Sequence, residues 1–199
     1  MVRIAILASG SGTNAQRLME HFSASALAEI ALIGCDKPEA GVVERAWRMG
    51  VPTYLFDGAA LRQGELQGEL ERAGIGLVVL AGFLRLIPVA MVQAWPDRII
   101  NIHPSLLPRH GGKGMYGHRV HEAVLAAGDQ ESGITIHLVN ERYDEGRTLF
   151  QARCPVLPGD TPDSLAQRIH GLEHAHYPAV VEQYLRELAG EHGREVRTP

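Results

Sequence analysis

The chain has 199 residues, 45% of them hydrophobic, which predicts one globular domain with an ordinary core. Its 19 basic and 23 acidic residues give a formal net charge of -4, so it lacks the basic excess that drives nonspecific nucleic-acid binding, and a small substrate is favoured over RNA. Two cysteines are too few for a disulfide framework or a metal cluster, and no apolar run approaches the roughly 18 residues of a spanning helix, so we expect a soluble, cytoplasmic protein.

Five short apolar runs alternate with amphipathic stretches along the first hundred residues. Apolar runs without strict alternation are typical of strands that are buried on both faces of a parallel sheet. The expected strands are 4–8, 30–34, 53–56, 77–81 and 99–102, and the expected helices between them are 13–23, 38–49, 60–73 and 88–94. This alternation predicts an α/β fold with a doubly wound, mostly parallel sheet and right-handed crossovers.

The pattern changes after residue 102. A Gly- and Pro-rich stretch at 104–117 precedes a short expected helix at 120–127. Two β-rich runs follow, at 133–140 and 148–156. Because only a short turn joins them, they predict an antiparallel addition to the sheet.

A long last helix is expected from Thr161, an N-cap residue, with Pro162 at the first helical position. The helical pattern continues to about residue 188, and Pro178 is expected to kink or break it. Residues 1–189 would then form a single domain, and the polar residues 190–199 a frayed tail.

A glycine-rich loop, Ser9 to Asn14, joins the first expected strand to the first expected helix. Its glycines allow the backbone to approach a ligand at the N-terminus of the helix, which suits a phosphate. It is not a P-loop, because no Gly-Lys-Ser/Thr follows, and Gln16 stands where the dinucleotide fingerprint expects a small residue. A tight turn with an N-cap remains the alternative.

Asn101 and His103 stand at the end of the fifth expected strand, where alternation places them on one side, and Pro104 stiffens the exit. Open α/β sheets bind ligands at the carboxyl ends of their strands. An amide beside an imidazole suits oxyanion stabilisation and proton movement, the two needs of acyl transfer to an amine. A strand-end asparagine and an ordinarily hydrogen-bonded histidine are the alternative.

Several motifs then follow one another in a recognisable order. They are Ala81-Gly82-Phe83-Leu84-Arg85-Leu86-Ile87, Asn101-Ile102-His103-Pro104-Ser105-Leu106-Leu107-Pro108, Gly133-Ile134-Thr135-Ile136-His137 and Tyr143-Asp144-Glu145-Gly146. With them the chain resembles the folate-dependent formyltransferases from about Arg3 to Tyr177. The resemblance implies a Rossmann-like formyltransferase fold, 10-formyltetrahydrofolate as co-substrate, and glycinamide ribonucleotide of purine biosynthesis as the acceptor. No metal is expected, because the ten histidines are scattered without the spacing of metal ligands.

The resemblance also implies roles for residues. Asn101, His103 and Asp144 match the family's catalytic set, and His137 matches a supporting histidine. The matching ribonucleotide and phosphate site is Ser11, Gly12, Thr13, Asn14 and Glu173, and the matching folate site is Arg85, Leu86, Ile87, Asn101, Val139 and Asp144. Residues 1–100 would bind the ribonucleotide, and residues 101–189 would supply catalysis and folate binding. A solvated helix position for Glu173 and a locally satisfied strand histidine for His137 are the alternatives.

Other formyl-group users share this catalytic set, namely methionyl-tRNA formyltransferase, formyltetrahydrofolate hydrolase and sugar-amine formyltransferases. We expect neither a basic C-terminal tRNA domain nor the hydrolase's extra N-terminal domain, and the glycine-rich loop favours a phosphorylated acceptor. A folate- or nucleotide-binding module without catalysis is a further alternative, because such sheets host many functions.

The stretch 109–118 is longer than in the better-known form of the family and is a candidate lid. A monomer or a homodimer is expected.

Overall fold

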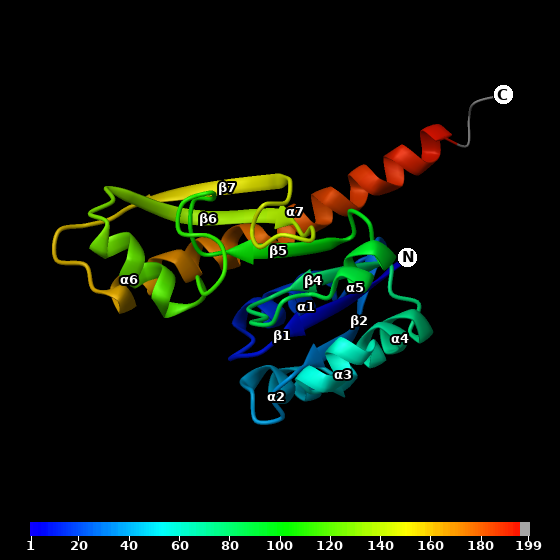
Figure 1. Ribbon diagram of the computed structural model, residues 1–199. Helices are drawn as coiled ribbons and strands as arrows, with labels where there is room; N and C mark the ends of the chain where they lie inside the picture. The colour runs from blue at the N-terminus through cyan, green and yellow to red at the C-terminus, as the bar shows by residue number, and fades with distance from the viewer. Residues whose placement is uncertain (196–199) are drawn as a thin grey trace.

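The computed structural model describes residues 1–195 of the chain, and the side chains of residues 1–190. Its centre is a seven-stranded sheet with the order β3-β2-β1-β4-β5-β6-β7 (Figure 1). The strands are β1 (Val2–Ala8), β2 (Ala28–Cys35), β3 (Thr53–Leu55), β4 (Leu77–Leu80), β5 (Ile99–His103), β6 (Glu131–Leu138) and β7 (Thr148–Pro155). The first five are parallel, whereas β6 pairs antiparallel with β5 and β7 antiparallel with β6. The predicted doubly wound sheet with an antiparallel addition is confirmed.

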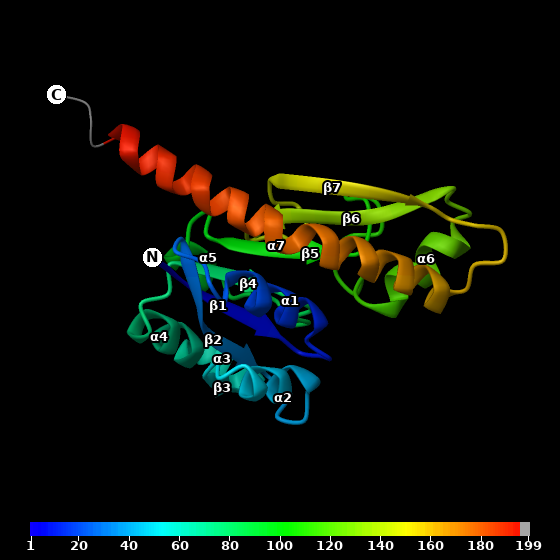
Figure 2. The same cartoon turned by 180° about the vertical axis from the view of Figure 1, so that it is seen from behind.

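Helices cover the sheet on both sides (Figures 1 and 2). One buried cluster joins the sheet to α1 (Thr13–Phe22), α2 (Gly41–Arg48), α6 (His118–Ala126) and α7 (Pro162–Glu195). A second cluster joins the other face to α3 (Gly58–Gln63), α4 (Glu65–Arg72) and α5 (Val89–Ala94). Within residues 1–195, none of these helices has the length and apolar character that a membrane crossing requires.

Two of the expected helices differ from the structure. The single helix expected at 60–73 is two helices, because Gly64 adopts a left-handed conformation (φ 83) that ends α3. The first of them begins earlier than expected, since the Asp57 carboxylate accepts the N–H groups of Ala59 and Ala60. α2 begins at Gly41 rather than at residue 38, because a turn closed by a hydrogen bond from Ala40 N to Lys37 O precedes it.

The last helix is longer and more regular than expected. α7 is continuous from Pro162 to Glu195, so the break expected at Pro178 is wrong, although proline removes one helical N–H donor. The neighbouring Tyr177 packs α7 against the sheet at this point, since it is 1% exposed and its hydroxyl donates to Leu80 O at 2.8 Å and to Ile100 O at 3.3 Å. Of the frayed tail expected at 190–199, residues 196–199 lie outside the described residues.

Tyr177→Phe is expected to lower the free energy of unfolding by about 1–3 kcal/mol, because two buried carbonyl groups of β4 and β5 lose their shared donor. Urea unfolding followed by circular dichroism measures the difference. Tyr54→Phe is the matched control, because that half-buried ring stacks on Phe56 and should change stability by less than about 0.5 kcal/mol. Equal stabilities for the two variants would show that the Tyr177 hydroxyl contributes nothing.

Candidate active site

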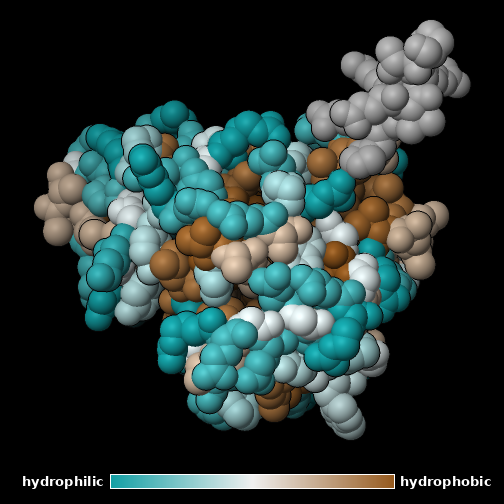
Figure 3. Space-filling model, turned by 45° about the vertical axis from the view of Figure 1, so that its right-hand side comes forward, coloured by the Kyte–Doolittle hydropathy of each residue, from teal (hydrophilic) through white to brown (hydrophobic). Residues whose placement is uncertain are grey.

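A cavity of about 270 Å³ lies at the carboxyl ends of the central strands. The chain moves outward from β1 to β3 and then crosses back to β4, so the loops after β1 and β4 leave in opposite directions, and a crevice opens between them. The cavity is walled by the glycine-rich loop after β1, the segment after β4, the end of β5, and the loops that precede α6 and β7. On the face shown in Figure 3, hydrophobic surface gathers in a band between the polar upper and lower parts of the molecule.

Asn101 and His137 face each other across the β5–β6 pair, where they are register partners. The His137 Nδ1 lies 2.9 Å from the carbonyl oxygen of Leu138, which can only accept, so Nδ1 donates and carries the ring proton. Nε2 then accepts the hydrogen bond from the Asn101 amide at 3.1 Å. His137 is 2% exposed, and burial lowers its pKa, which agrees with a neutral ring.

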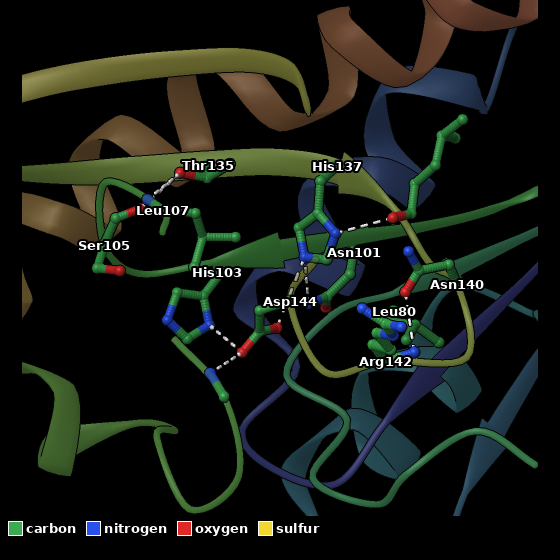
Figure 4. Close-up of polar contacts among 12 residues, drawn as sticks. Leu80, Asn101, His103, Ser105, Leu107, Thr135, His137, Asn140, Arg142 and Asp144 are labelled. Atoms are coloured by element: carbon green, nitrogen blue, oxygen red, sulfur yellow. Dashed lines mark hydrogen bonds and ion pairs between the residues drawn. The ribbon is translucent and has the colours of Figure 1, made fainter. Parts of the chain in front are cut away.

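Asp144 lies between two histidines (Figure 4). Its Oδ2 accepts the N–H of Gly112 at 2.8 Å and lies 3.6 Å from His103 Nδ1, while its Oδ1 lies 3.7 Å from His137 Nε2. The other ring nitrogen of His103, Nε2, donates to the carbonyl oxygen of His110 at 2.8 Å. His103 therefore directs Nδ1 toward the carboxylate.

The loop that carries Asp144, residues 139–147, is closed at its neck. Leu138 N donates to Arg147 O at 2.9 Å, so the chain leaves β6 and returns to β7 at one point. Gly146 lies against this neck, since a Cβ there would stand 1.7 Å from the Leu138 carbonyl oxygen. The register of the two strands also shifts between Ile136 and His137, next to the start of this loop.

A carboxylate, an imidazole and an amide thus meet at one wall of the cavity. The amide and a protonated ring nitrogen can donate hydrogen bonds to a developing oxyanion, and the carboxylate can accept a proton. The arrangement suits acyl transfer to an amine.

The glycine-rich loop reaches the same cavity. Gly12 precedes α1 in a left-handed conformation (φ 76), and a Cβ there would stand 2.6 Å from the Cα of Val42, so the close packing of α2 requires glycine. Among the described residues no side chain caps α1, unlike the expected N-cap alternative, and its first N–H groups are available to an anion. The expected phosphate residues that line the cavity are Ser11, Gly12, Thr13 and Asn14.

Glu173 on α7 lies beside this loop. Its carboxylate accepts the Asn14 amide at 2.8 Å and is 7% exposed, so it is not a solvated helix position. Burial raises the pKa of Glu173, and the hydrogen bond from Asn14 partly opposes that shift. The Asn14 Oδ1 is buried and has no hydrogen-bond partner in the described part of the chain, as expected of an atom that awaits a ligand donor.

Comparison with known proteins decides the family. Residues 2–181 match the formyl transferase family. The chain is a member of that family. It is 44% identical over 186 residues to "Phosphoribosylglycinamide formyltransferase, chloroplastic" of Arabidopsis thaliana, an alignment that covers 90% of this chain and 64% of the relative. It is 38% identical over 196 residues to "Phosphoribosylglycinamide formyltransferase" of Bacillus subtilis (strain 168), with 93% and 95% covered.

Solved structures agree with the fold of this formyl transferase. The crystal structure of glycinamide ribonucleotide transformylase 1 from Symbiobacterium toebii superposes with a TM-score of 0.87 at 37% sequence identity. That likeness covers 94% of this chain and 89% of the other. The chain therefore spans most of this bacterial structure but about 64% of the Arabidopsis relative.

The expected folate residues of this formyl transferase line the same cavity as the phosphate loop. Arg85, Leu86, Ile87 and Val139 all line the cavity. Ile87 is 4% exposed and Leu86 49%, so one closes the wall from behind and the other offers apolar surface. Arg85 is fixed by a hydrogen bond from its Nε to Asp36 Oδ2 at 2.5 Å, a partner that the sequence did not indicate.

The long loop of this formyl transferase, 109–118, also lines the cavity. Gly112, Gly114, Met115 and Tyr116 contribute to the wall, and the Gly112 N–H bonds to Asp144. Sequence reasoning missed His121 on α6 and His170 on α7, which line the same cavity. His121 stands on the buried face of α6, where ordinary core residues also stand, and His170 is exposed on α7, so neither had a distinctive signal in the sequence.

His121 makes the acid stability of the formyl transferase testable. It is 3% exposed, and burial, together with the nearby His170, His118 and His103, lowers its pKa to about 4 from the usual 6.5. The unfolded chain therefore binds the proton first, so the stability from neutral His121 is fully present above pH 6.5 and is lost as the pH falls toward about 4.

Between pH 7 and pH 4, the free energy of unfolding of His121→Gln is expected to fall by up to about 3 kcal/mol less than that of the unchanged protein. Urea unfolding at several pH values measures this change. His137, whose pKa burial also lowers, is present in both proteins, so only the difference between the two curves reports His121. Parallel curves would contradict the prediction.

Proposed function

We propose that this protein is a phosphoribosylglycinamide formyltransferase, which transfers the formyl group of 10-formyltetrahydrofolate to the amine of glycinamide ribonucleotide in purine biosynthesis. The observation that carries the proposal is a single cavity that contains both the glycine-rich loop and the group formed by Asn101, His103 and Asp144. The Arabidopsis and Bacillus relatives with the same printed name support the choice of acceptor and the purine pathway.

The amine attacks the formyl carbon directly, and no covalent enzyme intermediate forms. The new C–N bond gives a tetrahedral oxyanion, to which the Asn101 amide and the Nδ1–H of protonated His103 donate hydrogen bonds, because His103 Nε2 already donates to the His110 carbonyl. Asp144, directly or through a water, takes a proton from the attacking nitrogen and returns it to N10 of the folate as the old C–N bond breaks. The products are formylglycinamide ribonucleotide and tetrahydrofolate, and proton and charge balance.

The substrates occupy opposite ends of the cavity. Ser11 to Asn14 bind the phosphate through backbone N–H groups and hydroxyls, and Glu173 accepts hydrogen bonds from the ribose. Arg85, Leu86, Ile87 and Val139 receive the pterin, with polar groups at its edges and apolar groups on its faces. These assignments cross the division expected at residue 100, because the folate residues Arg85, Leu86 and Ile87 precede it and the ribose partner Glu173 follows it. The protein would act as a cytoplasmic monomer or homodimer.

The proposal is tested with 10-formyl-5,8-dideazafolate, a stable formyl donor, by following deformylation with and without glycinamide ribonucleotide. Turnover that requires the ribonucleotide is the expected result. Turnover without it would instead indicate a hydrolase, and turnover only with a sugar amine would indicate that class of acceptor. No turnover with any acceptor, with the donor bound, would leave a folate-binding module and contradict catalysis.

A further inference from the structure

The backbone carbonyl of His110 contacts the ring of His103. Its carbonyl oxygen accepts the hydrogen bond from His103 Nε2 at 2.8 Å, and His103 is 4% exposed. His110 itself has a left-handed backbone (φ 51), which is unfavourable for a residue with a Cβ unless the surroundings hold it. The orientation of this carbonyl therefore needs an anchor.

The anchor is the side chain of the same residue. The His110 Nε2 lies 2.7 Å from Asp129 Oδ2, and both side chains are mostly buried, at 16% and 13% exposed. Asp129 stands just beyond the end of α6, so the pair ties the loop after β5 to that helix. The other carboxylate oxygen of Asp129 lies 3.6 Å from Arg109 Nη2, whose side chain is 59% exposed.

The two ring nitrogens of His103 have different partners as a result. A carbonyl oxygen only accepts, so Nε2 keeps a proton in both the neutral and the charged ring, and every change of protonation occurs at Nδ1. Nδ1 is the atom that faces Asp144 at 3.6 Å. If the carbonyl of His110 turned away, the neutral ring would be free to place its proton on either nitrogen.

We propose that His110 and Asp129 are positioning residues, whose side-chain hydrogen bond holds the backbone of His110 so that the proton of neutral His103 stays on Nε2 and Nδ1 stays directed at Asp144. Neither residue touches the substrates. The effect on turnover rests on the function proposed above, whereas the effect on the His103 ring does not.

Three variants of the 199-residue chain test the inference. Asp129→Ala removes the carboxylate that binds the His110 ring. Asp129→Asn keeps a side-chain oxygen that can accept the hydrogen bond from the ring Nε2–H of His110. Arg109→Ala leaves that pair intact and removes only the guanidinium near Asp129 Oδ1. Ring-nitrogen NMR of ¹⁵N-histidine protein, at a pH where the ring is neutral, reports the His103 tautomer. The His103 signals are identified by their absence in His103→Ala.

The expected tautomer is Nε2–H in the unchanged protein, in Asp129→Asn and in Arg109→Ala, and a mixture in Asp129→Ala. In the formyl-transfer assay, kcat of Asp129→Ala should fall by about tenfold to a hundredfold, with both KM values within about threefold, because a misplaced catalytic group costs rate rather than substrate binding. Asp129→Asn should recover most of this loss.

The inference is overturned if His103 keeps the Nε2–H tautomer in Asp129→Ala. This holds even if the variant loses activity and thermal stability together, because such a loss would come from a general structural defect. An Asp129→Asn protein with the same mixed tautomer as Asp129→Ala also overturns it. If no variant and not even the unchanged protein transfers formyl groups, the proposed function fails, and the NMR comparison still decides the role of His110 and Asp129.

Discussion

Replacing Asp144 with asparagine is expected to lower kcat of formyl transfer by about 10²–10⁴, because the amide cannot take a proton from the attacking amine. The change is sterically mild. Asparagine tolerates the left-handed backbone of this position (φ 55), and its oxygen can still accept the Gly112 N–H. Steady-state kinetics with the formyl donor and glycinamide ribonucleotide should therefore show the loss mainly in kcat, with an unchanged melting temperature.

Asp97→Asn is the matched control for this change. Asp97 has nearly the same left-handed conformation (φ 54) but is exposed and lies outside the cavity lining. Its replacement should leave kcat within about twofold, since surface changes of this kind have small effects. If Asp144→Asn turned over as fast as Asp97→Asn, Asp144 would have no part in the chemical step.

His103→Ala is expected to lower kcat by about 10²–10³, the usual cost of removing one donor to an oxyanion. The change also leaves the His110 carbonyl without its donor, so the melting temperature must be measured beside the rate. Because His103 and Asp144 act as a unit in the proposed mechanism, the double variant should be about as slow as the slower single variant.

The control for His103→Ala is His21→Ala. His21 is paired with Glu182 at 2.7 Å on the surface between α1 and α7 and is not among the residues that line the cavity. The His21→Ala variant should keep full activity. Any decrease in its melting temperature measures what the removal of a paired histidine costs in stability. A folded His103→Ala protein with a rate near that of His21→Ala would exclude His103 from catalysis.

The parallel half of the sheet could be predicted because its strands are buried on both faces and therefore form continuous apolar runs, such as Ile4 to Ala8. Features that depend on a single backbone conformation or on distant packing could not. Nothing in the local pattern shows that Gly64 is left-handed, and the hydrogen bonds from Tyr177, beside Pro178, to the carbonyl groups of β4 and β5 join residues far apart in the sequence.

The candidate site divides in the same way. The sequence predicts Asn101 and His103 at the end of a strand, and in the structure both lie in the last three residues of β5. The closeness of Asp144 followed only from the family resemblance, because the loop that brings it back has no periodicity to interpret. The pairs Asn14–Glu173, Arg85–Asp36 and His110–Asp129 join residues far apart in the sequence, and no local signal connects them.

The closed neck between Leu138 and Arg147 makes the Asp144 loop a self-contained insert in the framework. Its two ends are already hydrogen-bonded, so residues between them can change in number or kind without moving the β6–β7 register. Val139, Asn140, Arg142 and Tyr143, which line the cavity, are all in this insert. Exchanging the segment between relatives is thus expected to change the cavity wall and to keep the pairing of β6 with β7, provided that the Gly146 position keeps its glycine.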